Sequence, residues 1–168
     1  FSSVNAQEID VKGGNLEVPE YLKRTPNLYQ TPSTAGGYGD GELYLRGFDM
    51  NNVSVVINGQ PVNDMEEGWV YWSNWAGLSD LTSSIQIQRG LSASSLAVPS
   101  VGGVVSVNTR ASELEPSTRL KFLQGNDNYQ KMSFSHNTGV NERGWSSSYL
   151  LSLWEGDGYL NGTEGAGV

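Results

Sequence analysis

Four short segments of alternating apolar and polar residues constrain the fold of this chain more than any other feature. Two of them end in an arginine followed by a glycine, at Arg46-Gly47 and at Arg89-Gly90. Successive side chains of a β-strand point to opposite faces, so each arginine lies opposite the apolar residues that precede it. The four segments are residues 42–48, 53–59, 85–90 and 101–107. They predict a sheet that fixes two cations, each beside a glycine that permits a turn or a close approach.

The composition excludes several classes of protein. A chain of 168 residues with 37% hydrophobic and 17% charged residues can bury one ordinary core. The net charge of −8 and the lack of a basic cluster argue against a nucleic-acid partner. The chain has no cysteine and only one histidine, His136, so we expect no metal site and no cofactor. It has neither a signal peptide nor an initiating methionine, and we expect it to be a piece of a longer protein.

Together the four segments resemble the plug domain of TonB-dependent outer-membrane receptors. The resemblance covers residues 17–110 and depends on the order of several motifs: Leu45-Arg46-Gly47-Phe48, Val56-Ile57-Asn58-Gly59, Leu78 to Ser84, Gln88-Arg89-Gly90 and Gly102-Gly103-Val104. Residues 61–66 and 69–75 resemble the branch found in Bacteroidetes-type bacteria. The resemblance implies an α+β plug domain, a small mixed sheet with short helices. The structural turns would then be formed by Gly47, Asn58, Gly59, Gly90, Gly102 and Gly103.

The segment after Pro116 has a different pattern, which divides the chain into three parts. Residues 119–124, 129–137 and 145–154 alternate apolar and polar side chains over a length typical of membrane β-strands. A soluble β-meander would show the same alternation, but the preceding plug-like region favours the membrane interpretation. We therefore expect an extended arm at 1–16, the plug domain at 17–116, and the first strands of an antiparallel transmembrane β-barrel at 117–168.

Shorter local signals complete the expected organisation. Pro19 near the start of residues 18–24 favours a short helix there. The glycine-rich residues 31–41 are typical of a loop, and Asn58-Gly59 is a strong signal for a tight hairpin turn.

The two arginines of the Arg-Gly pairs have a structural role in the family. From the residues alone, Arg46 and Arg89 could equally be ordinary surface or hairpin arginines. The resemblance implies that they pair with carboxylates of the barrel wall and hold the plug in the lumen. A guanidinium group can engage two carboxylates, and a buried one needs such partners because its desolvation is costly.

Residues 64–75 form an aromatic and acidic segment with three interpretations. It holds three of the five tryptophans beside Asp64, Glu66 and Glu67. The rings could fill space between plug and barrel, or they could stack on a ligand. Two carboxylates could also hydrolyse a glycosidic bond, although no other feature supports this chemistry. By resemblance, the segments exposed to the outside are 38–40, 49–52 and 64–75, and the candidate substrate contacts are Tyr38, Asp49, Asn51, Trp69, Tyr71 and Trp72.

The resemblance implies a function in nutrient uptake and no enzymatic activity. The plug would occlude the barrel, help to bind substrate at its outer face, and be remodelled by TonB and its inner-membrane motor. The implied substrate is a metal chelate, vitamin, oligosaccharide or peptide. The implied location is the outer membrane of a Gram-negative bacterium. The implied partners are the rest of the barrel, TonB, outer-membrane lipid and a surface lipoprotein. The alternatives are a secreted carbohydrate-binding β domain that uses the tryptophan-rich segment, and a surface glycosidase.

Overall fold

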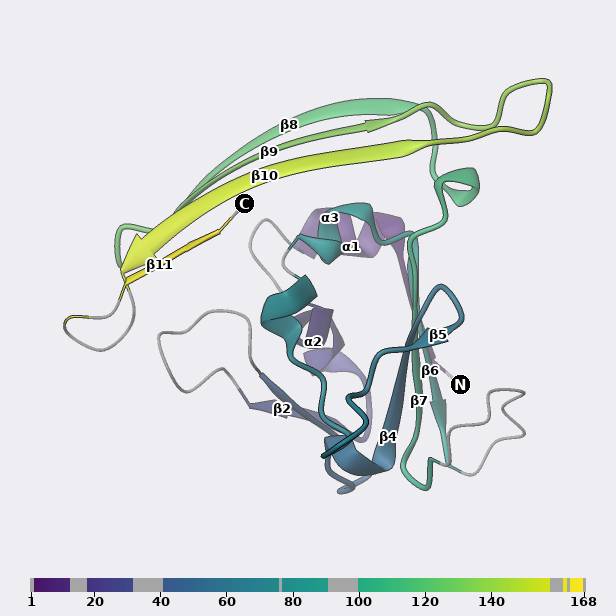
Figure 1. The fold of residues 1–168 in the computed structure, drawn as a ribbon, viewed down its shortest axis with the longest axis vertical. Coiled ribbons are helices and arrows are strands. Elements are labelled where there is room, and N and C mark those ends of the chain that lie inside the picture. The colour runs from purple at the N-terminus through teal and green to yellow at the C-terminus, as the bar shows by residue number, and fades with distance from the viewer. Residues whose placement is uncertain are drawn as a thin grey trace.

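The chain forms a small mixed sheet with short helices beside it, and a curved antiparallel sheet arches over them (Figure 1). The computed structural model describes residues 2–12, 18–31, 41–75, 77–90, 100–157, 162 and 164–167. The mixed sheet has the strand order β1-β6-β7-β4-β5, the curved sheet has the order β11-β10-β9-β8, and β2 pairs with β3. The strands are β1 (Ser2–Asn5), β2 (Leu28–Thr31), β3 (Glu42–Leu45), β4 (Val53–Ile57), β5 (Gln60–Pro61), β6 (Ser84–Arg89), β7 (Gly103–Asn108), β8 (Ser117–Gln124), β9 (Gln130–Asn137), β10 (Ser148–Asp157) and β11 (Glu164–Gly167). The α-helices are α1 (Ala6–Lys12), α2 (Val18–Tyr21) and α3 (Leu78–Leu81), and the 3₁₀ helices are η1 (Leu22–Arg24), η2 (Met50–Asn52), η3 (Trp72–Trp75) and η4 (Ala111–Glu113).

The mixed sheet is built around β4 and β7, which lie side by side in parallel. All five residues of β4, four of them Val or Ile and one Ser54, are buried, as expected for a strand that is covered on both faces. On its other side β7 pairs with β6 in an antiparallel manner. Alternate residues of β3 and β6 enter the same core, namely Leu43, Leu45, Ile85 and Ile87. The predicted α+β architecture is therefore confirmed.

Two tight turns have the same backbone form. Asn58-Gly59 joins β4 to β5 with φ angles of 50° and 87°, and this predicted hairpin turn is confirmed. Arg46-Gly47 follows β3 with φ angles of 58° and 83°, and the backbone N–H and C=O groups of Leu45 and Phe48 bond across it. Strand β3 thus ends one residue before the arginine. Arg46 itself occupies a left-handed conformation that residues other than glycine, asparagine and aspartate seldom adopt.

The expected extended arm over residues 1–16 is wrong for the residues that the structure describes. Strand β1 pairs with β6, and α1 follows it directly. Val4 and Ile9 are buried in the main core, which explains why this segment packs against the domain. The side chain of Asn5 accepts a hydrogen bond from the backbone N–H of Glu8 at 2.9 Å, which caps the first turn of α1.

The short helices lie close to their predicted positions. The helix expected over residues 18–24 is confirmed as α2 continued by η1, and α3 begins at Leu78, where the family resemblance implied a short helix. Residues 32–40, which make up most of the expected glycine-rich loop, lie outside the described residues. Within the described ranges, no helix is long and apolar enough to cross a membrane.

The curved sheet has one apolar and one polar face, as the alternation predicted. Strands β8, β9 and β10 form an antiparallel meander whose outward side chains are exposed, including Leu120, Phe122, Met132, Phe134, Tyr149, Leu151 and Leu153. The alternate side chains face the mixed sheet and are mostly polar, including Ser133, Ser135, Asn137 and Ser152, although Leu123, Leu150 and Trp154 belong to this face too. Turns at residues 126–128 and 141–144 connect β8 to β9 and β9 to β10.

The two sheets meet at α3. Gly77, just before this helix, lies so close to β10 that an added Cβ would be 3.2 Å from Leu150 Cδ2 and 3.3 Å from Ser152 Oγ. In Figure 1 the curved sheet passes directly over α1 and α3. The inner face of the meander therefore packs against α3.

Candidate functional site

The aromatic segment 64–75 is anchored to β4 by a single asparagine. The side-chain oxygen of Asn63 accepts a hydrogen bond from Val55 N–H at 2.8 Å, and its amide nitrogen donates to Val53 C=O at 3.0 Å. The same nitrogen also donates to Gly68 C=O at 2.8 Å. Asn63 thus extends the strand pairing of β4 beyond β5 and ties the segment to it. The sequence analysis did not identify this residue.

Asp64 organises the turn that follows. Its Oδ1 atom accepts hydrogen bonds from the backbone N–H groups of Glu66 at 2.8 Å, Glu67 at 2.6 Å and Gly68 at 3.2 Å. These donors, that of Glu67 foremost, lower the pKa of the Asp64 carboxyl below its ordinary value. A glycosidase acid would need the opposite shift. Asp64 therefore has a structural role, in which its carboxylate accepts the backbone hydrogen bonds of this turn.

The aromatic residues of the segment divide into buried and exposed groups. Trp72 is 1% exposed and belongs to the core, so the expectation that it contacts substrate is corrected here. Its large apolar ring fills space beneath the sheet, where no ligand can reach it. Trp69 and Trp75 are partly buried and pack against the same core. Tyr71, which is 50% exposed, presents its ring to the surface.

Two of the three predicted substrate-facing segments lie side by side. A Cβ added to Gly68 would be 3.4 Å from Asn51 Cα, so η2 and the aromatic segment are in contact. Asp49 and Asn51 are exposed there, and the Asn52 amide donates to Asp49 Oδ1 at 2.6 Å. Tyr38, the candidate from the third segment, lies outside the described residues.

The two Arg-Gly pairs also meet in space. A Cβ added to Gly90 would be 3.0 Å from Arg46 Nη1, so the guanidinium group of Arg46 rests against the second glycine. The guanidinium of Arg89 donates to the Ser2 hydroxyl on β1. Among the described residues, neither arginine is ion-paired with a carboxylate. Arg46 therefore lies beside the residue that follows Arg89, and we call the part of the domain that holds both arginines the Arg corner.

A glycine of β7 allows the Arg corner to close. Gly103 has a φ of 139°, and a Cβ there would be 2.3 Å from Gln88 C=O and 2.8 Å from Leu45 Cδ2. Only a residue without a side chain lets these strands approach so closely. Gly103 was predicted as a turn residue, but it is the first residue of β7, where its lack of a side chain allows this packing.

Two tyrosines beside Arg46 were missed by the sequence analysis. Tyr29 on β2 and Tyr44 on β3 are cross-strand partners with ring centroids 6.0 Å apart. They line a hollow of about 600 Å³ together with Arg46 and Gly47. The Tyr44 hydroxyl donates to Glu42 Oε2 at 2.5 Å, and this bond is the main reason that the pKa of Tyr44 is raised. Tyr44 lies between Leu43 and Leu45, on the polar face of an alternating strand. This position was the sequence signal from which its partial exposure beside Arg46 could have been predicted.

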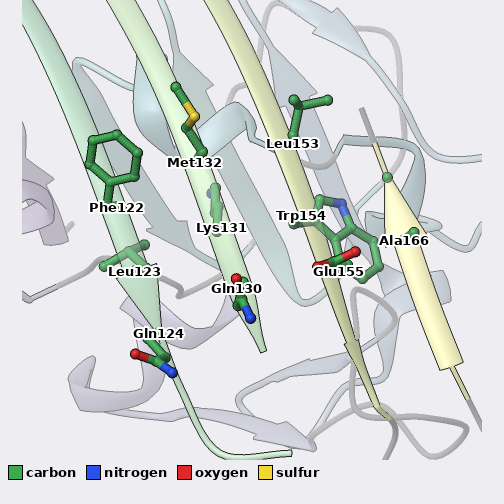
Figure 2. A pocket seen from close by; sticks show the side chains of 11 residues that line it. Phe122, Leu123, Gln124, Gln130, Lys131, Met132, Leu153, Trp154, Glu155 and Ala166 are labelled. Atoms are coloured by element: carbon green, nitrogen blue, oxygen red, sulfur yellow. The ribbon is translucent and has the colours of Figure 1, made fainter. Parts of the chain in front are cut away.

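A larger cleft of about 940 Å³ lies at the end of the curved sheet (Figure 2). Phe122, Met132 and Leu153 approach it from the outward face of three neighbouring strands, whereas Lys131 and Trp154 belong to the inner face. Because the lining combines both faces of one sheet, the cleft is not a single enclosed site. We assign no ligand to it.

The fold and its two faces define a class of protein. A small mixed sheet lies beneath strands that are apolar outside and polar inside, which is the arrangement of a plug within the wall of a membrane β-barrel. The family model described as "TonB-dependent Receptor Plug Domain" matches residues 1–104, and the chain belongs to this family. Its members are receptors of the outer membrane of Gram-negative bacteria, and this is the location of the chain. The match begins at residue 1, in agreement with the packing of β1 and α1.

Known proteins with similar sequences or structures belong to the same group. The chain is 24% identical over 154 residues to the probable TonB-dependent siderophore receptor PirA of Acinetobacter baumannii, covering 85% of this chain and 20% of that protein. It is 27% identical over 128 residues to the vitamin B12 transporter BtuB of Vibrio cholerae, covering 76% and 20%. The solved structure of the FrpB iron transporter from Neisseria meningitidis (F5-1 variant) superposes with a TM-score of 0.70 at 16% identity, covering 98% of this chain and 27% of that one. The chain spans about a fifth of the length of these curated relatives, and none of the similarities supports a carbohydrate-binding domain.

Proposed function

We propose that this chain is the plug and the first wall strands of a receptor that imports a scarce nutrient through the outer membrane. The observation that supports this most strongly is the packing of the plug helices against the polar inner face of the curved sheet, whose outer face is apolar. The plug occludes the barrel, binds substrate on its outer side, and is remodelled by TonB and its inner-membrane motor. No bond of the substrate is broken. The partners are the remaining barrel, TonB and membrane lipid, with a surface lipoprotein as a further candidate.

The substrate surface that we propose consists of the adjoining segments 49–52 and 64–75. Tyr71 offers an aromatic face, Trp69 supports it from partly buried packing, and Asp49 and Asn51 supply polar groups beside it. Tyr38, which lies outside the described residues, stays in the set as a contact predicted from the sequence. The relatives are a siderophore receptor and a vitamin B12 transporter, so ferric siderophores and vitamin B12 are the first substrates to test.

Uptake by the complete receptor tests this function. Cells that carry the receptor should accumulate radiolabelled vitamin B12 or a ferric siderophore only when TonB is present. Tyr71→Ala should weaken binding of the transported probe about fivefold, because a stacked ring contributes on the order of 1 kcal/mol. Tyr149→Ala, which removes another exposed tyrosine ring from the outward face, is the control and should bind normally. TonB-independent accumulation, or equal loss in both variants, would contradict the proposal.

The Arg corner is our proposed latch to the barrel wall. Arg46 and Arg89 lie together without a carboxylate partner among the described residues, which is the charge pattern that an acidic wall would complete. In the complete receptor, the double change Arg46→Ala and Arg89→Ala should loosen the plug and raise the passive conductance of the protein in lipid bilayers. Unchanged conductance would argue against the latch.

A further inference from the structure

A second, oppositely charged contact joins the plug to the wall, and it involves none of the residues of the Arg corner. Asp80 lies on α3 of the plug, whereas Lys121 and Lys131 lie on β8 and β9 of the wall. Lys121 Nζ is 3.1 Å from Asp80 Oδ1, and Lys131 Nζ is 3.0 Å from Asp80 Oδ2. One plug carboxylate therefore bridges two lysines of neighbouring wall strands, one on each oxygen.

The burial of these groups distinguishes them from an ordinary surface ion pair. The side chains of Asp80 and Lys131 are only 6% and 7% exposed, and that of Lys121 is 26% exposed. Exposed pairs contribute little because water and salt screen them, whereas removing one partner of a buried pair leaves a desolvated charge without compensation. Removing the Asp80 carboxylate would therefore leave both Lys121 and Lys131 without their shared ion partner.

The backbone around Asp80 is shaped for this contact. Gly77 precedes α3 with a φ of 80° and packs directly on Leu150 and Ser152 of β10. A Cβ at this position would lie 3.2 Å from Leu150 Cδ2 and 3.3 Å from Ser152 Oγ, closer than an ordinary van der Waals contact. Three consecutive wall strands, β8, β9 and β10, therefore meet one short plug helix.

We propose that Asp80, Lys121 and Lys131 form an electrostatic lock that seats α3 on the inner wall of the barrel. This Asp80 lock has a plug anion and wall cations, the reverse of the Arg corner. It acts on a different face of the plug and does not depend on which substrate is transported. The lock gives a role to two lysines that lie on neighbouring strands of the inner face of the meander.

The test measures plug seating in the complete receptor, not transport, so it is independent of the proposed uptake function. The receptor is inserted into planar lipid bilayers, and urea is raised until passive conductance appears. Asp80→Asn keeps the shape of the side chain but removes its charge, and conductance should appear at a urea concentration about 1–2 M lower than for the wild type. Arg110→Gln breaks the exposed Arg110–Glu113 pair and is the matched control, with no expected shift.

Exchanging the charges of Asp80 and Lys131 distinguishes a specific electrostatic contact from a general loss of stability. Asp80→Lys alone places three cations together and should lower the urea threshold further. Combining it with Lys131→Asp restores one anion and two cations, with an ion pair between positions 80 and 131, and should recover at least half of that loss. Barrel assembly of every variant is checked by its altered mobility on unheated gels. An unchanged threshold for Asp80→Asn, or a double variant no better than Asp80→Lys, would overturn the proposal.

Discussion

At the scale of single residues, polar side chains determine the shape of the candidate substrate surface. Asn63 and Asp64 are consecutive, and each binds several backbone groups. Both bind Gly68: the Asn63 amide donates to its C=O, and the Asp64 carboxylate accepts from its N–H. Their bonds place Trp69 and Tyr71 before any ligand is present. A preorganised surface binds more tightly because less conformational entropy is lost on binding.

The lowered pKa of Asp64 gives this turn a defined pH dependence. A carboxyl whose folded pKa is depressed stabilises the fold above its unfolded value of about 3.9, and that stabilisation is lost as the pH falls through the folded value. We expect residues 64–75 to lose protection from hydrogen exchange below about pH 4. Mass spectrometry of the complete receptor, corrected for intrinsic exchange, measures this. Asp64→Asn cannot titrate and should show no such transition; a transition in both proteins would assign it to other groups.

Gly103 should be among the positions of the plug that tolerate substitution least. Gly103→Ala places a Cβ 2.3 Å from Gln88 C=O and should lower the free energy of unfolding by about 2–4 kcal/mol. Gly47→Ala is the control, because Gly47 also has a positive φ but has nothing within 4 Å of the added Cβ. It should cost only the backbone strain of about 1–2 kcal/mol. Urea unfolding of the plug in the complete receptor compares the two, and equal losses would argue against the close approach.

At the scale of elements, periodic strands were predictable and the N-terminal elements were not. Strands β6, β8, β9 and β10 alternate over six or more residues, so their faces could be read from the sequence. Strand β1 buries only Val4, and one apolar residue among three polar ones produces no recognisable period. The capping pair Asn5 and Glu8 was the signal that could have revealed α1. The tryptophan segment shows a different limit, because composition could not separate buried Trp72 from exposed Tyr71.

Strand β1 should contribute measurably to the plug. Val4→Ala removes two methyl groups from the core and should lower the free energy of unfolding by about 1–2 kcal/mol. Ser3→Ala, at the neighbouring exposed position, is the control and should have almost no effect. The same urea unfolding measurement applies. If Val4→Ala changed the free energy of unfolding no more than Ser3→Ala does, β1 would not unfold together with the rest of the plug.

At the scale of the whole molecule, the outward face of the meander matches a membrane surface. The cross-strand rows Leu120-Phe134-Leu151 and Phe122-Met132-Leu153 form an apolar band, and the next outward row, Gln124-Gln130-Glu155, is polar. A band that ends in a polar row is the pattern expected where a barrel wall leaves the hydrocarbon core.

A charge within this band should obstruct membrane folding. Leu151→Arg should reduce the folding free energy of the complete receptor in lipid vesicles by about 2–4 kcal/mol, because the arginine would face hydrocarbon. Gln130→Arg, in the polar row, should cost at most about 1 kcal/mol. Urea titration of the vesicle-bound receptor measures both variants. An equal loss of folding free energy in the two variants would contradict the assignment of the apolar band to the hydrocarbon core.

The position of β7 in the mixed sheet sets the order in which the plug can be completed as it folds. It is the last of the five strands along the chain, yet it lies in the middle, between β6 and β4. Until β7 is in place, β1 and β6 on one side and β4 and β5 on the other have no strand to join them. The hairpins of the wall are local and close quickly, whereas the parallel β4–β7 pairing joins residues that are distant in the sequence and forms more slowly. A partly folded plug is therefore two separate half-sheets, exposed to wrong partners until its central strand is in place.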